Sequence, residues 1–185
     1  MKEIRNTDFS KCRSGRIVTS GLLLAIAIMT ACIAFAQDET GLKFKGGIGV
    51  VPVTGVAANG AVNLNIVRGV PPGGPWRIAA LEAVVTSDGR IKIEGRGLLL
   101  ASGNGIGTNA GQTVHATLFC GPAASATAHD STGVALEADG DFRIDDFLSP
   151  APPSVCETPV LLIRNAGGVW FAAGILTSEG ERHDK

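Results

Sequence analysis

Tyrosine is absent from this 185-residue chain, and aromatic residues of all kinds make up only 5% of it. Aromatic rings are the surfaces on which proteins commonly stack nucleobases, so their scarcity argues against base-stacking and carbohydrate-binding surfaces. Charged residues are also few, at 18%, and the formal net charge is −1. Because a nucleic-acid-binding domain needs a basic patch, this composition predicts no nucleic-acid partner.

Catalytic signatures are missing as well. From residue 37 onward there is no G-x-S-x-G, H-E-x-x-H or C-x-x-C pattern, the signatures of serine hydrolases, zinc peptidases and dithiol sites. The histidines do not converge, because His115 lies in a predicted strand, His129 in a Ser/Thr/Ala-rich loop and His183 in the tail. We therefore expect no enzyme activity and no cofactor. Glycoside chemistry by paired carboxylates stays open, although it usually comes with aromatic sugar platforms, which are few here.

A helical periodicity of 3.6 residues is almost missing after residue 40. Short alternating or wholly apolar runs are instead separated by Gly, Pro, Asn and Asp about every ten residues, as in chains built from short strands. The predicted fold class is all-β, a single-domain antiparallel β-sandwich or flattened barrel of about 8–10 short strands. This domain is expected to span residues 37–185, with a frayed tail from about residue 177.

Residues 1–36 have the pattern of a secretory signal peptide. Five basic residues lie within the first twenty, and an uncharged apolar run follows from Gly21 to Ala36. The run ends in the small residues Ala34 and Ala36, ahead of the polar Gln37. Signal peptidase is therefore expected to cut between Ala36 and Gln37.

Two alternatives to simple cleavage stay open. The uncharged stretch from Ile17 to Ala36 is long enough for an uncleaved membrane anchor, and Cys32 follows residues that resemble a lipoprotein cleavage box. Cleavage predicts a secreted, periplasmic or otherwise extracytoplasmic protein with no stable membrane span. The anchor predicts a chain attached to the membrane through its N-terminal segment.

Export also changes the charge and the cysteine count. From Gln37 the chain has 11 Lys and Arg against 15 Asp and Glu, a formal net charge of −4, and it keeps two of the four cysteines, Cys120 and Cys156. Two cysteines in an oxidising compartment indicate a disulfide. Cys120 ends a predicted strand on its inward face, and Cys156 lies in a Pro-rich crossing. The bond would therefore pin an irregular segment to the sheet edge, where no ladder hydrogen bonds hold it.

Two Asp-Gly steps predict hairpin turns, because Gly accepts a positive φ. The first, Asp88-Gly89, joins the β-rich runs Trp76–Val85 and Ile91–Leu100. The second, Asp139-Gly140, stands in the similar stretch Glu137–Asp145. In the first hairpin Lys92, Glu94 and Arg96 are expected on the wet face.

Other apolar runs predict further strands. Val160–Arg164 and Val169–Leu176 form a third hairpin whose strands are apolar on both faces, which suits the middle of a sheet. Strict alternation in Val62–Ile66 predicts that its three apolar residues face a core. Trp76 and Trp170 lie in apolar strand patterns and are expected in the core.

Two segments raise the question of a ligand. Gly105–Ala110 matches G-x-G-x-x-A, but a strand pattern follows it instead of the helix that a dinucleotide site needs, which favours a loop. Asp139, Asp141 and Asp145 are a candidate Ca²⁺ site because Ca²⁺ takes oxygen ligands. The D-x-D-x-D-G spacing is absent and Arg143 stands among the carboxylates, so we favour a solvated turn without a metal.

Four strand and turn segments and one cysteine stand out as a set, Asp88–Leu100, Val114–Cys120, Asp139–Asp145, Cys156 and Pro159–Ile163. As a set they resemble a group of exported bacterial β-proteins of uncharacterised function. Two shorter stretches, His115-Ala116 and Cys120-Gly-Pro-Ala123, are similar to CHRD-type domains, whose closely spaced histidines are missing here. The resemblance implies export, a β fold and a Cys–Cys bridge, and it implies no activity.

The leading hypothesis is a non-catalytic exported β-sandwich that serves as a structural or interaction module of the cell envelope or medium, with an unknown protein or envelope component as its partner. The alternative is a small-ligand or Ca²⁺-binding module. The third is a hydrolase whose residues assemble only in space.

Overall fold

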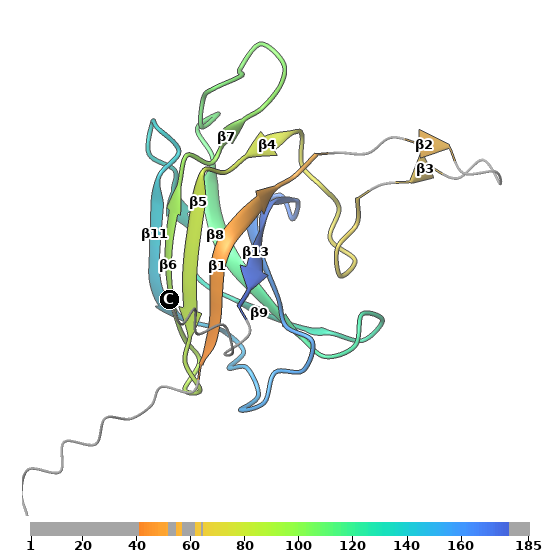
Figure 1. Cartoon of the computed structure of the whole chain (residues 1–185), viewed down its shortest axis with the longest axis vertical. Coiled ribbons are helices and arrows are strands. Elements are labelled where there is room, and N and C mark those ends of the chain that lie inside the picture. Colours follow the sequence, from red (N-terminus) through yellow and green to blue (C-terminus); the bar gives the residue numbers. More distant parts are fainter. Residues whose placement is uncertain (1–40, 52–54, 57–61, 64, 178–185) are drawn as a thin grey trace, which may run out of the picture. The chain divides into compact units, whose positions relative to one another are not determined.

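The computed structural model describes residues 41–51, 55–56, 62–63 and 65–177, which all belong to one compact unit, Asp38–Lys185. Every regular element in this part of the chain is a strand (Figure 1), which confirms the all-β prediction. No helix of the described part is suited to span a membrane. The predicted signal segment, its cleavage site at Ala36 and Gln37, and the tail after residue 177 lie outside the described residues.

One antiparallel sheet of nine strands makes up most of the fold, and it curls into a half-barrel (Figure 1). Its strands follow the order β10-β8-β12-β13-β1-β5-β6-β11, and β9 also pairs with β8. A single curled sheet is closer to the predicted flattened barrel than to two separate packed sheets. The strands of this sheet are β1 (Leu42–Gly49), β5 (Ala80–Val85), β6 (Arg90–Arg96), β8 (Thr113–Cys120), β9 (Thr127–Asp130), β10 (Val134–Ala135), β11 (Phe142–Phe147), β12 (Val160–Asn165) and β13 (Trp170–Leu176).

Four two-residue strands form two small sheets. β2 (Gly55–Val56) pairs with β3 (Val62–Asn63), and β4 (Trp76–Arg77) pairs with β7 (Leu99–Leu100). Trp76 on β4 stacks on Phe171 of β13 with 4.1 Å between the ring centroids. Trp170 is also buried and donates from Nε1 to the Asn65 carbonyl at 3.1 Å, so both tryptophans lie in the core as expected.

Alternation of side chains across the strands builds the core. Along β6 every second residue is buried, from Ile91 to Gly95, and the residues between them are exposed. β12 differs, because the consecutive residues Leu161–Ile163 are all fully buried. It lies between β8 and β13 in the middle of the sheet, as its wholly apolar run predicts. The third predicted hairpin, β12 to β13, is confirmed.

The first predicted hairpin is also confirmed, as β5 and β6 pair around Asp88-Gly89. Gly89 has a φ of 85° and donates its N–H to the Thr86 carbonyl at 2.9 Å. The Thr86 hydroxyl and the Arg90 N–H both donate to the Asp88 carboxylate, and these bonds lower the pKa of Asp88. The flanking runs are shorter than predicted, since each is split between the main sheet and the β4–β7 pair.

The second predicted hairpin is wrong in its strand pairing. The turn itself forms, with the Gly140 N–H donating to the Glu137 carbonyl at 2.9 Å. The strands on either side do not pair with each other, because β10 pairs with β8 and β11 pairs with β6. Leu136 precedes the turn, is buried, and donates its N–H to Gln112. This contact directs the incoming chain towards β8.

The strand predicted over Val62–Ile66 is only partly present. β3 covers Val62–Asn63, whereas Ile66 lies outside it and is 54% exposed, so the prediction that Ile66 faces a core is wrong. Val67 and Val70 bond to each other through their backbones just after this point. The chain therefore turns where the alternation would have continued the strand.

The Pro-rich crossing between β11 and β12, residues 149–158, is named the strap. Ser149 at its start exchanges two backbone hydrogen bonds with Asp130, at 2.8 and 2.9 Å. At its end the Gly121 N–H donates to the Glu157 carbonyl at 2.7 Å, and the Thr158 hydroxyl donates to the Gly121 carbonyl at 2.6 Å. The strap is thus fixed at both ends, to β9 and to the residue after β8.

Candidate functional site

The outward surface of β1, β5, β6 and β11 carries most of the described basic residues, and it is named the charged face. Its exposed charged side chains are Lys43, Lys45, Glu82, Arg90, Lys92, Glu94, Arg96, Arg143 and Asp145. Six of these are basic and three acidic, whereas the other charged residues of the described part are three basic and seven acidic. Positive charge is therefore concentrated on one side of the sheet.

Strand register orders these side chains into two rows across the four strands. One row reads Lys45, Glu82, Glu94, Arg143, and the other reads Lys43, Val84, Lys92, Asp145. Opposite charges on directly paired residues attract, and like charges repel. In the first row two carboxylates face each other between two basic ends.

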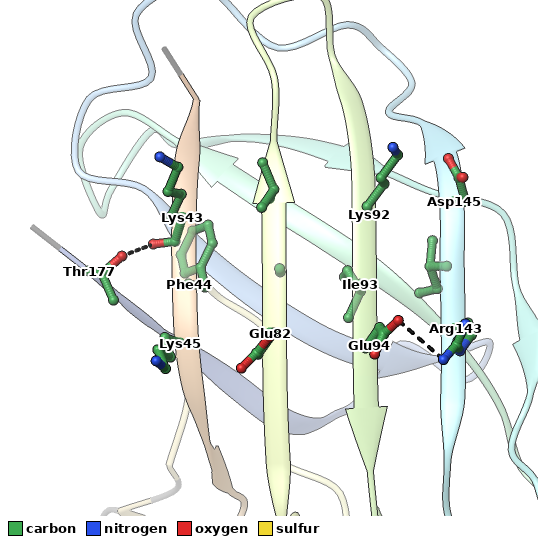
Figure 2. Close-up of a pocket in the computed structure, with 13 residues that line it drawn as sticks. Lys43, Phe44, Lys45, Glu82, Lys92, Ile93, Glu94, Arg143, Asp145 and Thr177 are labelled. Atoms are coloured by element: carbon green, nitrogen blue, oxygen red, sulfur yellow. Dashed lines mark hydrogen bonds and ion pairs between the residues drawn. The ribbon is translucent and has the colours of Figure 1, made fainter. Parts of the chain in front are cut away.

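A groove of about 480 Å³ lies among these side chains (Figure 2). Arg143 Nη2 lies 3.2 Å from Glu94 Oε1, and Arg90 Nη2 lies 2.8 Å from Asp145 Oδ1. Exposed ion pairs of this kind contribute about 0–1 kcal/mol each. They orient the side chains along the groove more than they stabilise the fold.

The three candidate Ca²⁺ ligands point to different partners. Asp139 Oδ1 accepts from the Asp141 N–H at 3.1 Å, Asp141 Oδ1 accepts from the Gly97 N–H at 2.9 Å, and Asp145 pairs with Arg90. Arg143, expected among these carboxylates, pairs with Glu94 instead, because strand pairing places Glu94 directly opposite it. The described residues contain no group of three or more His, Cys, Asp or Glu arranged to hold a metal ion.

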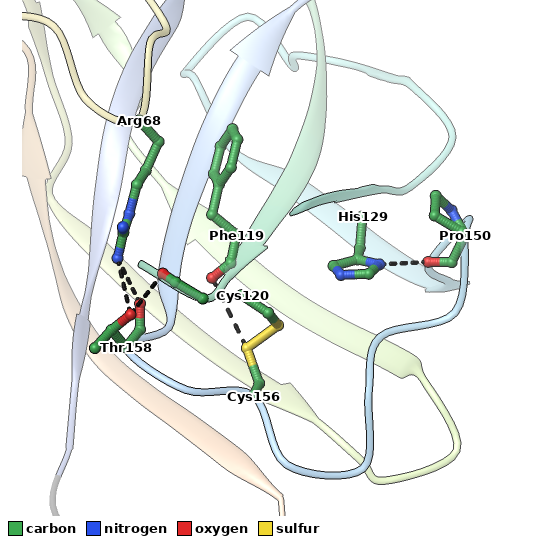
Figure 3. The surroundings of a disulfide bond; sticks show 8 residues. Arg68, Phe119, Cys120, His129, Pro150, Cys156 and Thr158 are labelled. Atoms are coloured by element: carbon green, nitrogen blue, oxygen red, sulfur yellow. Dashed lines mark hydrogen bonds between the residues drawn. A yellow bond between two sulfur atoms is a disulfide. The ribbon is translucent and has the colours of Figure 1, made fainter. Parts of the chain in front are cut away.

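Cys120 and Cys156 form a disulfide, with their Cα atoms 4.9 Å apart (Figure 3). Cα separations of 4.4–6.8 Å are usual for disulfides. Cys120 is the last residue of β8, and Cys156 lies in the strap. The bond fixes the irregular segment to the sheet, as predicted. The predicted edge position is wrong, because β8 pairs with both β12 and β9 and backbone hydrogen bonds also hold the strap at its two ends.

A polar cluster lies on β8, β9 and β12. Thr117 is fully buried and donates from Oγ1 to Asp130 Oδ1 at 2.5 Å. Arg164 Nη1 donates to Thr117 Oγ1 at 3.2 Å, and His115 Nε2 lies 3.9 Å from Asp130 Oδ1. Burial lowers the pKa of His115, although Asp130 opposes this effect. A nucleophilic hydroxyl needs a base within hydrogen-bond reach and access to substrate, so the buried Thr117 hydroxyl is better suited to tie strands together.

His129 is not in the loop that the sequence predicted. It lies on β9 and is 97% buried, with Nδ1 2.7 Å from the Pro150 carbonyl oxygen. The Ser/Thr/Ala composition around it suggested a loop, but pairing with β8 places His129 opposite the buried Leu118. Tertiary pairing thus overrides the local composition, and no signal in the sequence identified this residue.

The glycine-rich segment around Gly105–Ala110 consists of turns and is followed by β8, which confirms the predicted loop.

The charged face had a partial signal in the sequence. The alternation from Lys92 to Arg96 predicted one wet strand face, but the contributions of β1 and β11 depend on long-range pairing. Comparisons with protein-family models, with curated proteins and with solved structures give no match.

Proposed function

We propose that this chain is an exported, non-catalytic interaction module whose charged face binds an acidic segment of a partner protein in the cell envelope or the medium. The observation that carries the proposal is the charge segregation, six basic and three acidic side chains on the charged face against three basic and seven acidic elsewhere in the described part. Charge complementarity of this kind steers association and selects partners.

The order of charges within the charged face favours a protein partner over a uniformly charged polyanion. Glu82 and Glu94 lie opposite each other in the middle of a row that has Lys45 and Arg143 at its ends. A polyanion crossing the row would bring negative charge onto this carboxylate pair. An acidic peptide that carries one basic residue at its centre would satisfy the whole row.

A non-catalytic role is supported by the polar side chains of the described part. The Thr117 hydroxyl is buried and hydrogen-bonded to Asp130, and His115 Nε2 lies 3.9 Å from the same carboxylate. The buried Thr117 hydroxyl therefore has no access to a substrate, which hydrolysis by a hydroxyl nucleophile requires.

The proposal is tested with a glutamate-rich peptide that has a single central lysine. A length of roughly nine residues exceeds the about 14 Å across four neighbouring strands. Binding is measured by fluorescence anisotropy at low salt. The double variant Lys45→Glu/Lys92→Glu should bind at least about tenfold more weakly, equivalent to about 1.4 kcal/mol.

The matched control is Arg77→Glu, which reverses an exposed charge on β4, outside the charged face. It should leave the affinity nearly unchanged. An equal loss in Arg77→Glu, or equal binding of a single-stranded DNA of the same net charge, would contradict the proposal.

A further inference from the structure

A second pocket, distinct from the charged face, lies between the strap and the ends of β8 and β9. It has a volume of about 420 Å³, and its lining includes Cys120, Thr127, His129, Val155 and Glu157. On the strap side, Cys156 forms the disulfide and the Glu157 carbonyl accepts from the Gly121 N–H. These two bonds hold the strap side of the pocket at Cys156 and Glu157.

His129 supplies a buried polar atom that no described residue satisfies. Its Nδ1 faces the Pro150 carbonyl oxygen at 2.7 Å. Because a carbonyl only accepts, Nδ1 carries the hydrogen in the neutral ring, and Nε2 is an acceptor. This nitrogen is buried and has no hydrogen-bond partner among the described residues. Figure 3 shows the ring between Pro150 and the disulfide, with its free nitrogen on the disulfide side.

The other groups around the pocket have complementary chemistry. Glu157 contributes a carboxylate and Thr127 a hydroxyl, and none of the described residues that line the pocket is Lys or Arg. Val155 in the same lining is 73% exposed, an apolar side chain without cover. The pocket thus joins hydrogen-bond acceptors and a negative charge to an apolar wall, which suits a ligand with a positive donor head and an apolar body.

We propose that this pocket binds a primary amine that carries a short apolar chain. The ammonium group donates hydrogen bonds to the exposed Glu157 carboxylate and, where the pocket lining moves aside to expose this buried atom, to His129 Nε2, and the chain covers Val155. Ammonium has three donors and no acceptor, so it can serve both acceptors at once. This inference does not depend on the function proposed for the charged face.

The test uses n-hexylammonium as the probe, with hexanoate and hexanol as controls of equal chain length. Each compound is titrated into the full exported chain up to about 10 mM, the range of weak small-ligand binding. Binding is followed through the ¹⁵N resonances of the His129 ring and the backbone amides. We expect hexylammonium to move the Nε2 resonance and the amides around Thr127 and Glu157, and the two controls to have little effect.

Two substitutions distinguish binding in the pocket from general electrostatic attraction of the ammonium group to the protein. Glu157→Gln should lower the affinity for hexylammonium by roughly tenfold, because an exposed carboxylate is replaced by a neutral group of similar shape. Glu94→Gln, which removes a carboxylate on the charged face, should leave this affinity unchanged. Equal binding of hexanoate, an unchanged affinity in Glu157→Gln, or no movement of the Nε2 resonance would overturn the proposal.

Discussion

Gly95 shows how a single residue sets the packing between two strands. It pairs with Phe142 of β11, and the Phe142 ring lies where a side chain at position 95 would begin. The ring covers the glycine on the buried side of the sheet, and both residues are buried. A methyl group here would have to displace an aromatic ring in a packed core.

Gly95→Ala is therefore expected to lower the free energy of unfolding by about 1–3 kcal/mol, the usual cost of overpacking. Gly74→Ala is the matched control, because a Cβ at Gly74 would meet nothing within 4 Å. The control should change stability by less than about 0.5 kcal/mol. Urea denaturation of both variants checks the prediction, and equal effects in the two variants would contradict it.

The polar cluster around His115 predicts that the stability of the fold depends on pH. Burial lowers the pKa of His115 from its ordinary value of 6.5, with Asp130 raising it and Arg164 lowering it further. Between the lowered pKa and 6.5 the unfolded chain binds more protons than the folded chain, so stability rises with pH and is lost as the pH falls.

The free energy of unfolding should therefore decrease between about pH 7.5 and about pH 5.5. His115→Gln removes this titration and should show a smaller decrease over the same range. Denaturant titrations at both pH values measure the difference. A variant with the same or a steeper decrease would show that His115 does not titrate as the structure indicates.

Among the elements, the strap depends most clearly on one covalent bond. Cys120 and Cys156 are 36 residues apart in sequence, and a disulfide closing a loop of this size constrains the unfolded chain by roughly 3–4 kcal/mol in the entropy model. Cys120→Ser/Cys156→Ser should lower the free energy of unfolding by about this amount. Added reductant should then have no further effect on the double variant.

Thiol alkylation followed by intact-mass measurement provides the control for this prediction. The exported wild-type protein should take up no alkylating reagent at these two positions until a reductant is added. Two thiols that react without reductant would contradict the disulfide.

The elements differ in how far the sequence could predict them. The turn at Asp88-Gly89 and the buried strand β12 follow from local turn chemistry and apolar runs. The pairing around Asp139-Gly140 could not be predicted, because a turn motif does not indicate whether β10 pairs with β11 or with β8. The burial of His129 could not be predicted for the same reason, since it comes from β9 pairing with β8.

The candidate site depends on how the whole molecule orders its strands. The sequence predicted the outward charges of β6, but the order β1-β5-β6-β11 brings Lys45, Glu82, Glu94 and Arg143 into one row. The sequence as a whole has a formal net charge of −1. The net charge of the sequence therefore gave no indication of a face with an excess of basic side chains.

The proposed place of action depends on the N-terminal segment. Small side chains at Ala34 and Ala36 fit signal-peptidase pockets, and the apolar run ends there. We predict that the exported protein begins at Gln37. N-terminal sequencing of the protein from the medium or the envelope fraction checks this, and a chain that still begins at Met1 or carries lipid on Cys32 would contradict soluble export.

Chemical-shift mapping shows whether the charged face is the interface. The lysine-containing glutamate peptide is titrated into ¹⁵N-labelled protein, and the backbone amides are followed residue by residue. We expect the largest shifts at Lys43–Lys45, Glu82–Val84, Lys92–Glu94 and Arg143–Asp145, and we expect these shifts to diminish with added salt. Shifts concentrated on β8, β9 or the strap, or no shifts at peptide concentrations up to about 1 mM, would contradict it.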